Sequence, residues 1–318
     1  MSLIQKLAEF TKSKSDDGLF ILPETYGEGY IKSFNFGAQL NMMISQCEFK
    51  EEMIIKRAGG NSRKDEITFS FRNLFQQDKT QNPEGLALKR SIAMPSVQVS
   101  AGDIDIEVII PAKTKINTIV ITIHMDLLKS WINEKAENKF LNTITLSDKP
   151  YLYDQIISNE IEQVASKIAL LNDKEELSHF YLKLKTEEMI YLFLSELSKR
   201  ETITNYLLNV ADVKAMYAIK ETLCSDLSNP PDLTHLAFIS NMSESKMNKL
   251  FKQIFGNSIY NYYQALRMNE AAYLIREEKL SVSETGYRLG FSNLSHFSRI
   301  FEKHIGLKPK KYSAVPTS

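Results

Sequence analysis

Residues 245–256 read SKMNKLFKQIFG, and residues 295–306 read SHFSRIFEKHIG. At an offset of fifty positions the two stretches align serine with serine, apolar residues with apolar residues, and a final glycine with a final glycine. Apolar residues at i, i+3 and i+4 followed by glycine predict a helix with one buried face and a C-terminal stop. Each stretch also carries a cation on the opposite face. A basic helix that occurs twice in one chain indicates a partner that is contacted twice, and DNA is the first candidate.

The composition leaves room for two domains and distributes charge unevenly. The 318 residues include 39 Lys+Arg and 39 Asp+Glu, so the formal net charge is zero. Residues 212–318 hold 14 Lys+Arg against 10 Asp+Glu, an excess too small to establish a nucleic-acid partner by itself. Cys47 and Cys224 lie far apart, so we expect reduced, packed thiols. Because no apolar run suits a signal peptide or a membrane helix, we expect a cytoplasmic protein without a membrane partner.

The first part of the sequence favours β-structure. Between about residues 18 and 124 apolar and polar residues alternate, as at Ile67, Phe69 and Phe71, which predicts strands with one solvated face. Roughly eight such strands predict an antiparallel β-barrel of cupin or jelly-roll type. We therefore assign residues 1–150 to a barrel domain that senses an effector.

Helical spacing returns after Met125. We expect one helix to begin at Pro150 and a second, strongly apolar helix over 174–199. The second helix has more apolar residues than one buried stripe needs, so part of it is predicted to form a homodimer interface in addition to packing on the barrel. Residues 151–210 are accordingly assigned to a helical dimerisation and linker region.

Residues 211–318 have the pattern of two helix-turn-helix motifs, which makes the expected fold class α+β multidomain with an all-α C-terminal domain. In each motif a short helix, 233–239 or 282–289, precedes one of the two repeated helices. Ser243 and Asn293 are the predicted N-caps of the repeated helices.

The turn between the helices of each motif has its own requirements. It needs a residue that tolerates positive φ, which Asn241 and Gly290 supply. It also needs a small residue four positions earlier, so that the two helices can approach, and Ala237 and Gly286 fit. The sequence therefore predicts the same turn twice.

A long helix is predicted between the two motifs, over residues 258–276. About 18 helical residues span roughly 27 Å, which is close to the length of one DNA turn, about 34 Å. Both repeated helices are therefore expected to reach successive major grooves on one face of the duplex.

The face that each repeated helix leaves exposed carries the predicted DNA contacts. Asn, Arg and Lys match base edges in the major groove, while Ser and Lys suit phosphates. A single helix-turn-helix pattern is a weak signal, because helical hairpins are common, but two at a fixed offset with basic faces favour DNA binding. The predicted DNA-binding residues are Ser245, Asn248, Lys249, Lys252, Ser295, His296, Arg299 and Lys303.

Residues 211–315 resemble the DNA-binding domain of AraC/XylS-type transcription regulators. The resemblance is carried by MSESKMNKLFKQIFGNSIYNYYQALRMNEAAYLI and SVSETGYRLGFSNLSHFSRIFEKHIGLKPKKY. It implies two helix-turn-helix units in adjacent major grooves of a promoter, with a preceding barrel and helices that sense a ligand and dimerise. The base contacts that it implies come from Ser245, Asn248 and Lys249, and from Ser295, His296 and Arg299.

Two residues depart from the family pattern. Gly286 stands where the family usually has Ala, which lowers helix propensity but keeps the site small. Lys249 stands where Arg is common, and Lys cannot make the planar two-pronged contact of Arg to guanine. The second unit is therefore expected to discriminate between sequences more sharply than the first.

Catalytic, metal and cofactor chemistry find little support in the sequence. The barrel region contains one histidine, His124, so we expect no metal site. Neither a glycine-rich phosphate loop nor a nucleophile elbow occurs, so we expect no cofactor and no enzyme. An effector cavity is a hypothesis beside the more ordinary use of the same residues as filled core. The residues predicted to line it are Tyr26, Tyr30, Phe34, Phe36, Met42, Phe69 and Phe71.

The sequence thus predicts a homodimeric, effector-responsive transcription regulator that binds double-stranded promoter DNA. An activator of this kind has RNA polymerase as a further expected partner. The alternative is a ligand-independent DNA-binding co-regulator whose barrel serves only dimerisation. Stabilisation by a ligand separates the two, because a sensor gains stability from its effector and a scaffold does not.

Overall fold

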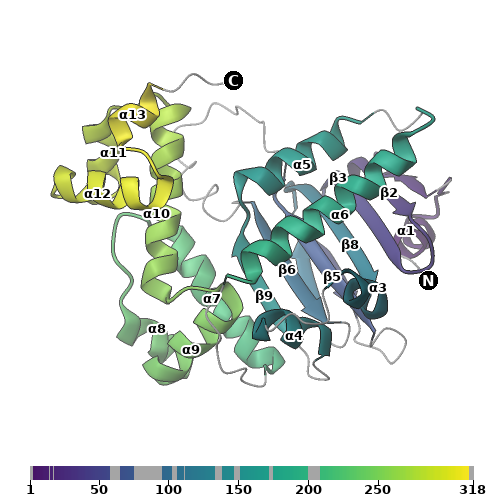
Figure 1. The fold of residues 1–318 in the computed structure, drawn as a ribbon, viewed down its shortest axis with the longest axis horizontal. Coiled ribbons are helices and arrows are strands. Elements are labelled where there is room, and N and C mark those ends of the chain that lie inside the picture. Colours follow the sequence, from purple (N-terminus) through teal and green to yellow (C-terminus); the bar gives the residue numbers. More distant parts are fainter. Residues whose placement is uncertain are drawn as a thin grey trace. The chain divides into compact units, whose positions relative to one another are not determined.

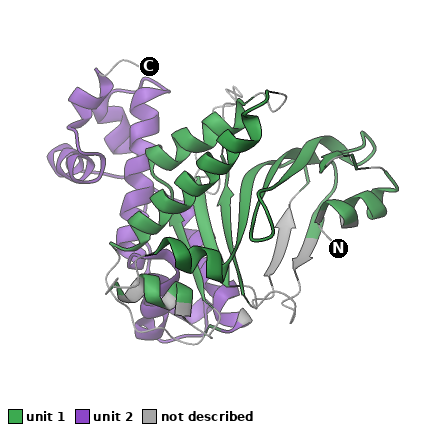
Figure 2. Cartoon of the chain, turned by 45° about the vertical axis from the view of Figure 1, so that its right-hand side comes forward, with its two compact units in different colours: residues 1–79, 95–208 green, residues 80–94, 209–318 purple. Residues whose placement is uncertain are grey.

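The chain divides into two compact units, which Figure 2 colours separately. The N-terminal unit comprises residues 1–79 and 95–208, and the C-terminal unit comprises residues 80–94 and 209–318. The structure is a computed structural model. It describes residues 3–13, 15–16, 18–57, 65–74, 95–101, 106–110, 112–132, 138–146, 151–171, 175–199 and 208–314.

An antiparallel sheet of seven strands forms the base of the N-terminal unit, in the order β1-β2-β3-β8-β5-β6-β9. A separate two-stranded sheet pairs β4 with β7. The strands are β1 (Leu19–Ile21), β2 (Gly27–Asn35), β3 (Leu40–Phe49), β4 (Met53–Arg57), β5 (Glu66–Arg72), β6 (Ser96–Ala101), β7 (Ile106–Ile110), β8 (Lys115–His124) and β9 (Leu152–Ile156).

The expected antiparallel sheet is confirmed, but the closed barrel is not. In the described part of the chain the seven-stranded sheet is open, because β1 and β9 stand at opposite ends of the strand order. Barrel closure requires the first and last strands to pair. Alternating residues show which side of a strand is buried and leave open which strands are neighbours, so they do not distinguish an open sheet from a barrel.

Helices α5 (Asn159–Ala169) and α6 (Ser178–Leu197) cover one face of this sheet, as Figure 1 shows. Phe193 of α6 meets Phe69 and Phe71 of β5 edge-on, at ring-centroid distances of 5.8 and 6.4 Å. All three rings are fully buried. The main core of the unit therefore lies between the sheet and these two helices.

Around β5, β6 and β9 the opposite face of the sheet carries polar residues. Thr68 of β5 lies between Thr122 and Ser100 on the neighbouring strands. On the same face Arg72 donates to the fully buried Asp154 over 2.5 Å. A buried carboxylate needs such a partner, because an unpaired buried charge is strongly destabilising.

The prediction of a helix that begins at Pro150 is wrong for the first part of that helix. Pro150 lies outside the described residues, and Leu152–Ile156 form β9, which pairs with β6. The helix α5 starts only after Ser158, whose side chain caps Ile161 N–H. Strand preference depends on the neighbouring strand more than on the segment itself, so pairing with β6 outweighs the helical spacing. The second expected helix is present as α6.

The N-terminal unit also contains, among its described residues, the shorter helices α1 (Leu3–Thr11), α3 (Met125–Trp131) and α4 (Lys139–Leu146). A second, smaller core lies between α1 and the first three strands, around Phe20, Ile31 and Phe49. His124, the last residue of β8, caps α3 by accepting from Asp126 N–H over 3.3 Å. Within the ranges that the structure describes, no helix is long and apolar enough to cross a membrane.

The C-terminal unit is entirely helical where it is described, and its two helix-turn-helix motifs are α8–α9 and α11–α12. The long helix α10 lies between them in sequence, as the pattern predicts. The helices are α7 (Val210–Ser225), α8 (Leu233–Ile239), α9 (Glu244–Phe255), α10 (Ile259–Arg276), α11 (Val282–Arg288), α12 (Leu294–Ile305) and α13 (Pro309–Ser313).

Candidate nucleic-acid interface

The turn of each motif has the geometry that the sequence predicts. Asn241 and Gly290 have φ of 53° and 76°, both in the left-handed region. Met242 N–H donates to the carbonyl of Ala237 over 3.1 Å in the first motif, and Phe291 N–H donates to Gly286 over 2.9 Å in the second. These matching bonds close the two turns in the same way.

The predicted caps of the two recognition helices, α9 and α12, are confirmed. Ser243 Oγ accepts from Lys246 N–H over 3.3 Å. Asn293 Oδ1 accepts from the N–H groups of Ser295 and His296 over 2.9 and 3.0 Å. Since side-chain caps satisfy otherwise unpaired helical N–H groups, both helices begin at a defined residue. Their C-terminal glycines, Gly256 and Gly306, have φ of 76° and 84°.

Each recognition helix packs through the predicted apolar face. Phe251 lies 4.4 Å from Phe255 and 5.4 Å from Tyr262, centroid to centroid. Ile300 is the exception among the predicted anchors, since it is only half-buried. The anchors that are buried are Met247, Leu250, Phe251, Phe297 and Phe301.

The predicted DNA-binding residues lie on the faces that remain accessible. Asn248 and Lys252 are half-buried, and Asn248 Nδ2 donates to the carbonyl of Glu244 over 3.2 Å. A DNA contact by Asn248 therefore has to replace or share this bond. The exposed members are Ser245, Lys249, Ser295, His296, Arg299 and Lys303.

Leu294 does not belong to the exposed face of α12. It is half-buried, and a Cβ built on Gly286 would lie 2.6 Å from its Cδ2. The missing side chain at Gly286 therefore leaves the space that Leu294 occupies. This packing accounts for the glycine at a position where the family usually has alanine.

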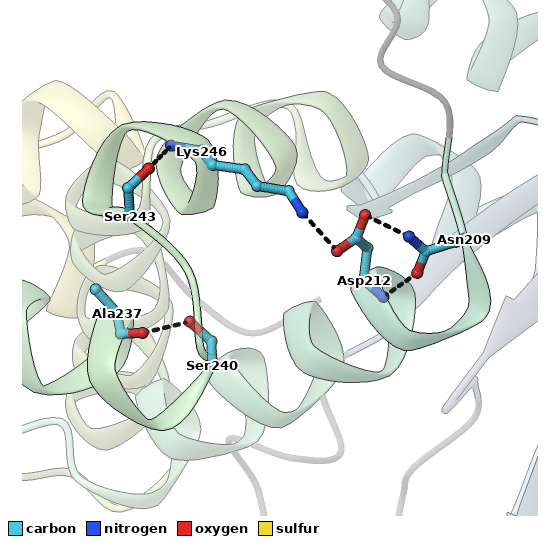
Figure 3. A network of polar contacts seen from close by, with 6 residues as sticks. All are labelled: Asn209, Asp212, Ala237, Ser240, Ser243 and Lys246. Atoms are coloured by element: carbon cyan, nitrogen blue, oxygen red, sulfur yellow. Dashed lines mark hydrogen bonds and ion pairs between the residues drawn. The ribbon is translucent and has the colours of Figure 1, made fainter.

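A polar network beside α9 was not predicted, and Figure 3 shows it from close by. Lys246 Nζ donates to Asp212 Oδ1 over 3.0 Å, and Asn209 Nδ2 donates to the other oxygen over 2.9 Å. The side chain of Asp212 is 10% exposed and that of Lys246 is 50% exposed. The first turn of α7 is thereby tied to the first turn of a recognition helix. The sequence offered one signal that the two helices differ here, because the offset of fifty aligns Lys246 with His296 and not with a second lysine.

The second recognition helix has a different flank. The His296 ring lies 6.0 Å from the ring of Phe291, centroid to centroid. Burial, together with the charge of Lys303, lowers the pKa of His304. The permanently positive side chains of this helix are those of Arg299 and Lys303.

The residues predicted to line an effector cavity divide into two groups. Tyr30 and Phe34 line a pocket of about 480 Å³ in the N-terminal unit. Met42, Phe69 and Phe71 are core residues that are at most 1% exposed and do not line this pocket. Phe36 packs against the same core and Tyr26 against the smaller one. Alternation alone could not separate core from cavity, because both lie on the apolar face of the sheet.

The described residues contain no group of three or more His, Cys, Asp and Glu side chains that could hold a metal ion. The two cysteines are free and buried, and burial raises the pKa of the Cys47 thiol to about 11. A thiol with so high a pKa is a poor nucleophile at neutral pH.

Residues 236–314 match the family model described as a helix-turn-helix domain. The chain is 34% identical over 88 residues to the HTH-type transcriptional activator RhaR of Cronobacter sakazakii, which covers 28% of this chain and 31% of RhaR. It is 28% identical over 130 residues to the transcriptional activator AggR of Escherichia coli, which covers 40% of this chain and 47% of AggR. An AraC-type regulator structure from Chromobacterium violaceum aligns over 33% of this chain and 95% of that chain, with 25% identity and a TM-score of 0.31.

The C-terminal unit thus carries a DNA-binding helix-turn-helix domain of the AraC type, as the resemblance implied. The chain spans less than half of the length of these curated relatives. Both relatives are named as transcriptional activators, which agrees with the expectation of a regulator rather than an enzyme.

Arg299→Ala should weaken binding to a specific site by roughly 1–3 kcal/mol and relax the preference at the base pair that Arg299 contacts. Lys303→Ala is the matched control, because a phosphate contact weakens binding to all sequences alike and reduces the salt slope by about 1. Fluorescence anisotropy with the site and its single-base variants measures both effects. An unchanged base preference in Arg299→Ala rules out the base contact.

Proposed function

We propose that the protein is a sequence-specific transcription regulator that binds double-stranded promoter DNA with α9 and α12 in adjacent major grooves. The observation that supports this most is the pair of capped recognition helices with basic residues on their accessible faces. The helix between them, α10, has 18 residues, which corresponds to roughly 27 Å. One chain therefore carries two recognition helices whose separation is about the length of one DNA turn.

Selection of bound sites from random double-stranded DNA tests this function directly. The full chain should enrich one site with two blocks of fixed bases about 10 base pairs apart, centre to centre. A doubly substituted Lys249→Ala, Arg299→Ala chain should lose both blocks while keeping its fold, because both side chains are exposed. Enrichment of no sequence by the unaltered chain refutes the proposal.

We further propose that the pocket of the N-terminal unit binds a small-molecule effector. Its walls come from β1, β2, β3, α5 with the residues that follow it, and α6, and most of its lining is aliphatic. Lys32 and Tyr30 provide the polar groups, with Lys32 Nζ over the ring of Phe34 at 5.4 Å and the Tyr30 hydroxyl donating to Gln46 over 3.1 Å. An apolar pocket with few polar groups is typical of small-molecule sites. This lining suits an apolar ligand with one acidic or hydrogen-bonding group.

A thermal-shift series with straight-chain carboxylic acids and the matching alcohols tests the pocket. Binding at 100 times the dissociation constant should stabilise the folded state by about 2.7 kcal/mol. Lys32→Met should reduce the stabilisation by the acids more than that by the alcohols, because only the acids carry a charge. Leu182→Trp, which fills the pocket, should abolish both. If no compound stabilises the unaltered chain, the ligand-independent co-regulator is the better description.

Homodimerisation through α6 is the third part of the proposal. Leu177, Phe180, Leu184 and Tyr191 are 73%, 59%, 45% and 68% exposed. Their spacing of 3, 4 and 7 residues places them on one stripe, the arrangement that packs helix against helix in coiled coils. On the same helix Lys183 and Lys185 precede Glu187 and Glu188, with which they pair. An antiparallel copy of α6 would bring the basic half of one helix to the acidic half of the other.

Phe180→Glu should convert the dimer into a monomer, because it places a charge within the apolar stripe. Leu170→Glu is the matched control, since Leu170 is 86% exposed and lies outside the stripe. Size-exclusion chromatography with light scattering gives the mass of each variant. A dimer that survives Phe180→Glu places the interface elsewhere.

A further inference from the structure

The long helix α10 contacts the segment before the first helix-turn-helix motif and the turn of the second motif through polar groups one turn apart. Tyr263 is fully buried, and its hydroxyl donates to the carbonyl of Leu227 over 3.0 Å. Leu227 lies in the segment that leads from α7 into the first motif, and it is 8% exposed. Tyr263 therefore fixes the entry of the first motif on the side of α10.

Arg267, four residues further along, fixes the turn of the second motif. Its guanidinium donates to the carbonyl of Leu289, the C-cap of α11. The same guanidinium stacks on the ring of Phe291 at 3.8 Å from the centroid. Arg267 is only 4% exposed. Because planar stacking and a charged hydrogen bond combine at one side chain, a lysine cannot reproduce this contact.

The segment before the first motif also touches the turn of the second motif directly at the same place. A Cβ built on Gly290 would lie 1.9 Å from the carbonyl oxygen of Ser228, so the backbones are in close contact. Ser228 is held in position by Asp226, whose Oδ1 accepts from its N–H over 2.8 Å and from its hydroxyl over 2.6 Å. These hydrogen bonds, with those from Asn229, lower the pKa of Asp226 to about 2. The Asp226 carboxylate that holds Ser228 is therefore ionised throughout the neutral pH range.

We propose that this joint, formed by Leu227, Ser228, Tyr263, Arg267, Leu289 and Gly290, sets the spacing of the two DNA half-sites that the protein accepts. The inference rests on the proposed function, in which α9 and α12 both enter the duplex. Inserting one base pair between the half-sites moves them by about 3.4 Å and rotates them by about one tenth of a turn. If the joint cannot adjust to the new spacing of the half-sites, the DNA has to deform instead, and this deformation weakens binding.

Arg267 and Tyr263 are positioning residues in this account, since neither reaches the DNA. A purely structural role for them predicts a loss of stability and a uniform loss of affinity. The joint predicts something different, namely a change in the tolerance for spacing. The preference for bases within each half-site should stay the same, because the accessible faces of α9 and α12 are untouched.

The test compares the selected site with versions that carry one base pair more or one base pair less between its two blocks. For the full unaltered chain each change should weaken binding roughly tenfold or more. In Arg267→Lys and Tyr263→Phe the same changes should cost only about two- to threefold, since the motifs can follow the half-sites. Base preference within each block, measured on single-base variants, should match that of the unaltered chain.

Two controls match these substitutions. Tyr312→Phe removes another tyrosine hydroxyl, which contacts Arg276 at 3.4 Å. Arg288→Lys makes the arginine-to-lysine change at an ion pair with Glu278. Neither touches the segment before the first motif, so both should keep the full spacing penalty. Thermal melts of all four variants show the share of each effect that comes from stability.

The outcomes separate this inference from the proposed function. If the unaltered chain enriches no DNA site, both the proposed function and the role of the joint are refuted. A chain that selects a site but shows the same spacing penalty in Tyr263→Phe as in the unaltered protein overturns the joint alone. If Arg267→Lys does not fold, Tyr263→Phe still decides, because it removes a single oxygen atom. An unaltered chain that accepts all spacings equally also overturns the joint.

Discussion

The arrangement of the C-terminal unit depends on one backbone constraint, a left-handed residue between the two helices of each motif. A residue with a Cβ pays roughly 1–2 kcal/mol for this conformation, unless it is Asn or Asp with a local hydrogen bond. Asn241 accepts the conformation in the first motif, and Gly290 does so in the second. At Gly290 the constraint is double, because the Ser228 carbonyl occupies the space of a side chain. The turn therefore fixes the helices of the second motif and its contact with the segment before the first motif at once.

In the N-terminal unit the matching constraint is the course of α6 across the sheet. Near its end Glu196 accepts from Gln155 of β9, and near its middle the Thr186 hydroxyl lies 3.2 Å from the sulfur of Met42 in β3. The 20 residues of α6 span about 30 Å, which is about the width of seven strands at about 4.8 Å. The pocket lies towards β1 and β2, beside the first half of α6 and the end of α5. The core is therefore continuous over β5 and β8, and the cavity lies near the β1 edge of the sheet.

What the sequence predicts well is local. Caps, left-handed turn residues and buried anchors depend on contacts within a few positions, so Ser243, Asn293 and Gly290 could be assigned from the pattern. The features that were missed depend on partners far along the chain. Leu152–Ile156 form β9 because they pair with β6. Asp212 pairs with Lys246, which lies 34 positions further along the chain. Closure of the sheet and the division between core and pocket are of the same kind, since both depend on which layers meet.

The two recognition helices share a scaffold but differ in electrostatics. In α9 the charge of Lys246 is balanced by the buried Asp212, so this lysine attracts DNA less than an unpaired lysine would. In α12 the corresponding residue is His296, which lies beside Phe291. At this position α12 therefore has a histidine in place of a lysine paired with a carboxylate, and Arg299 and Lys303 carry its positive charge. The second motif combines an arginine suited to guanine with a turn held by Arg267. In the proposed binding mode, the motif that carries the arginine is also the one whose turn is held by a buried side chain.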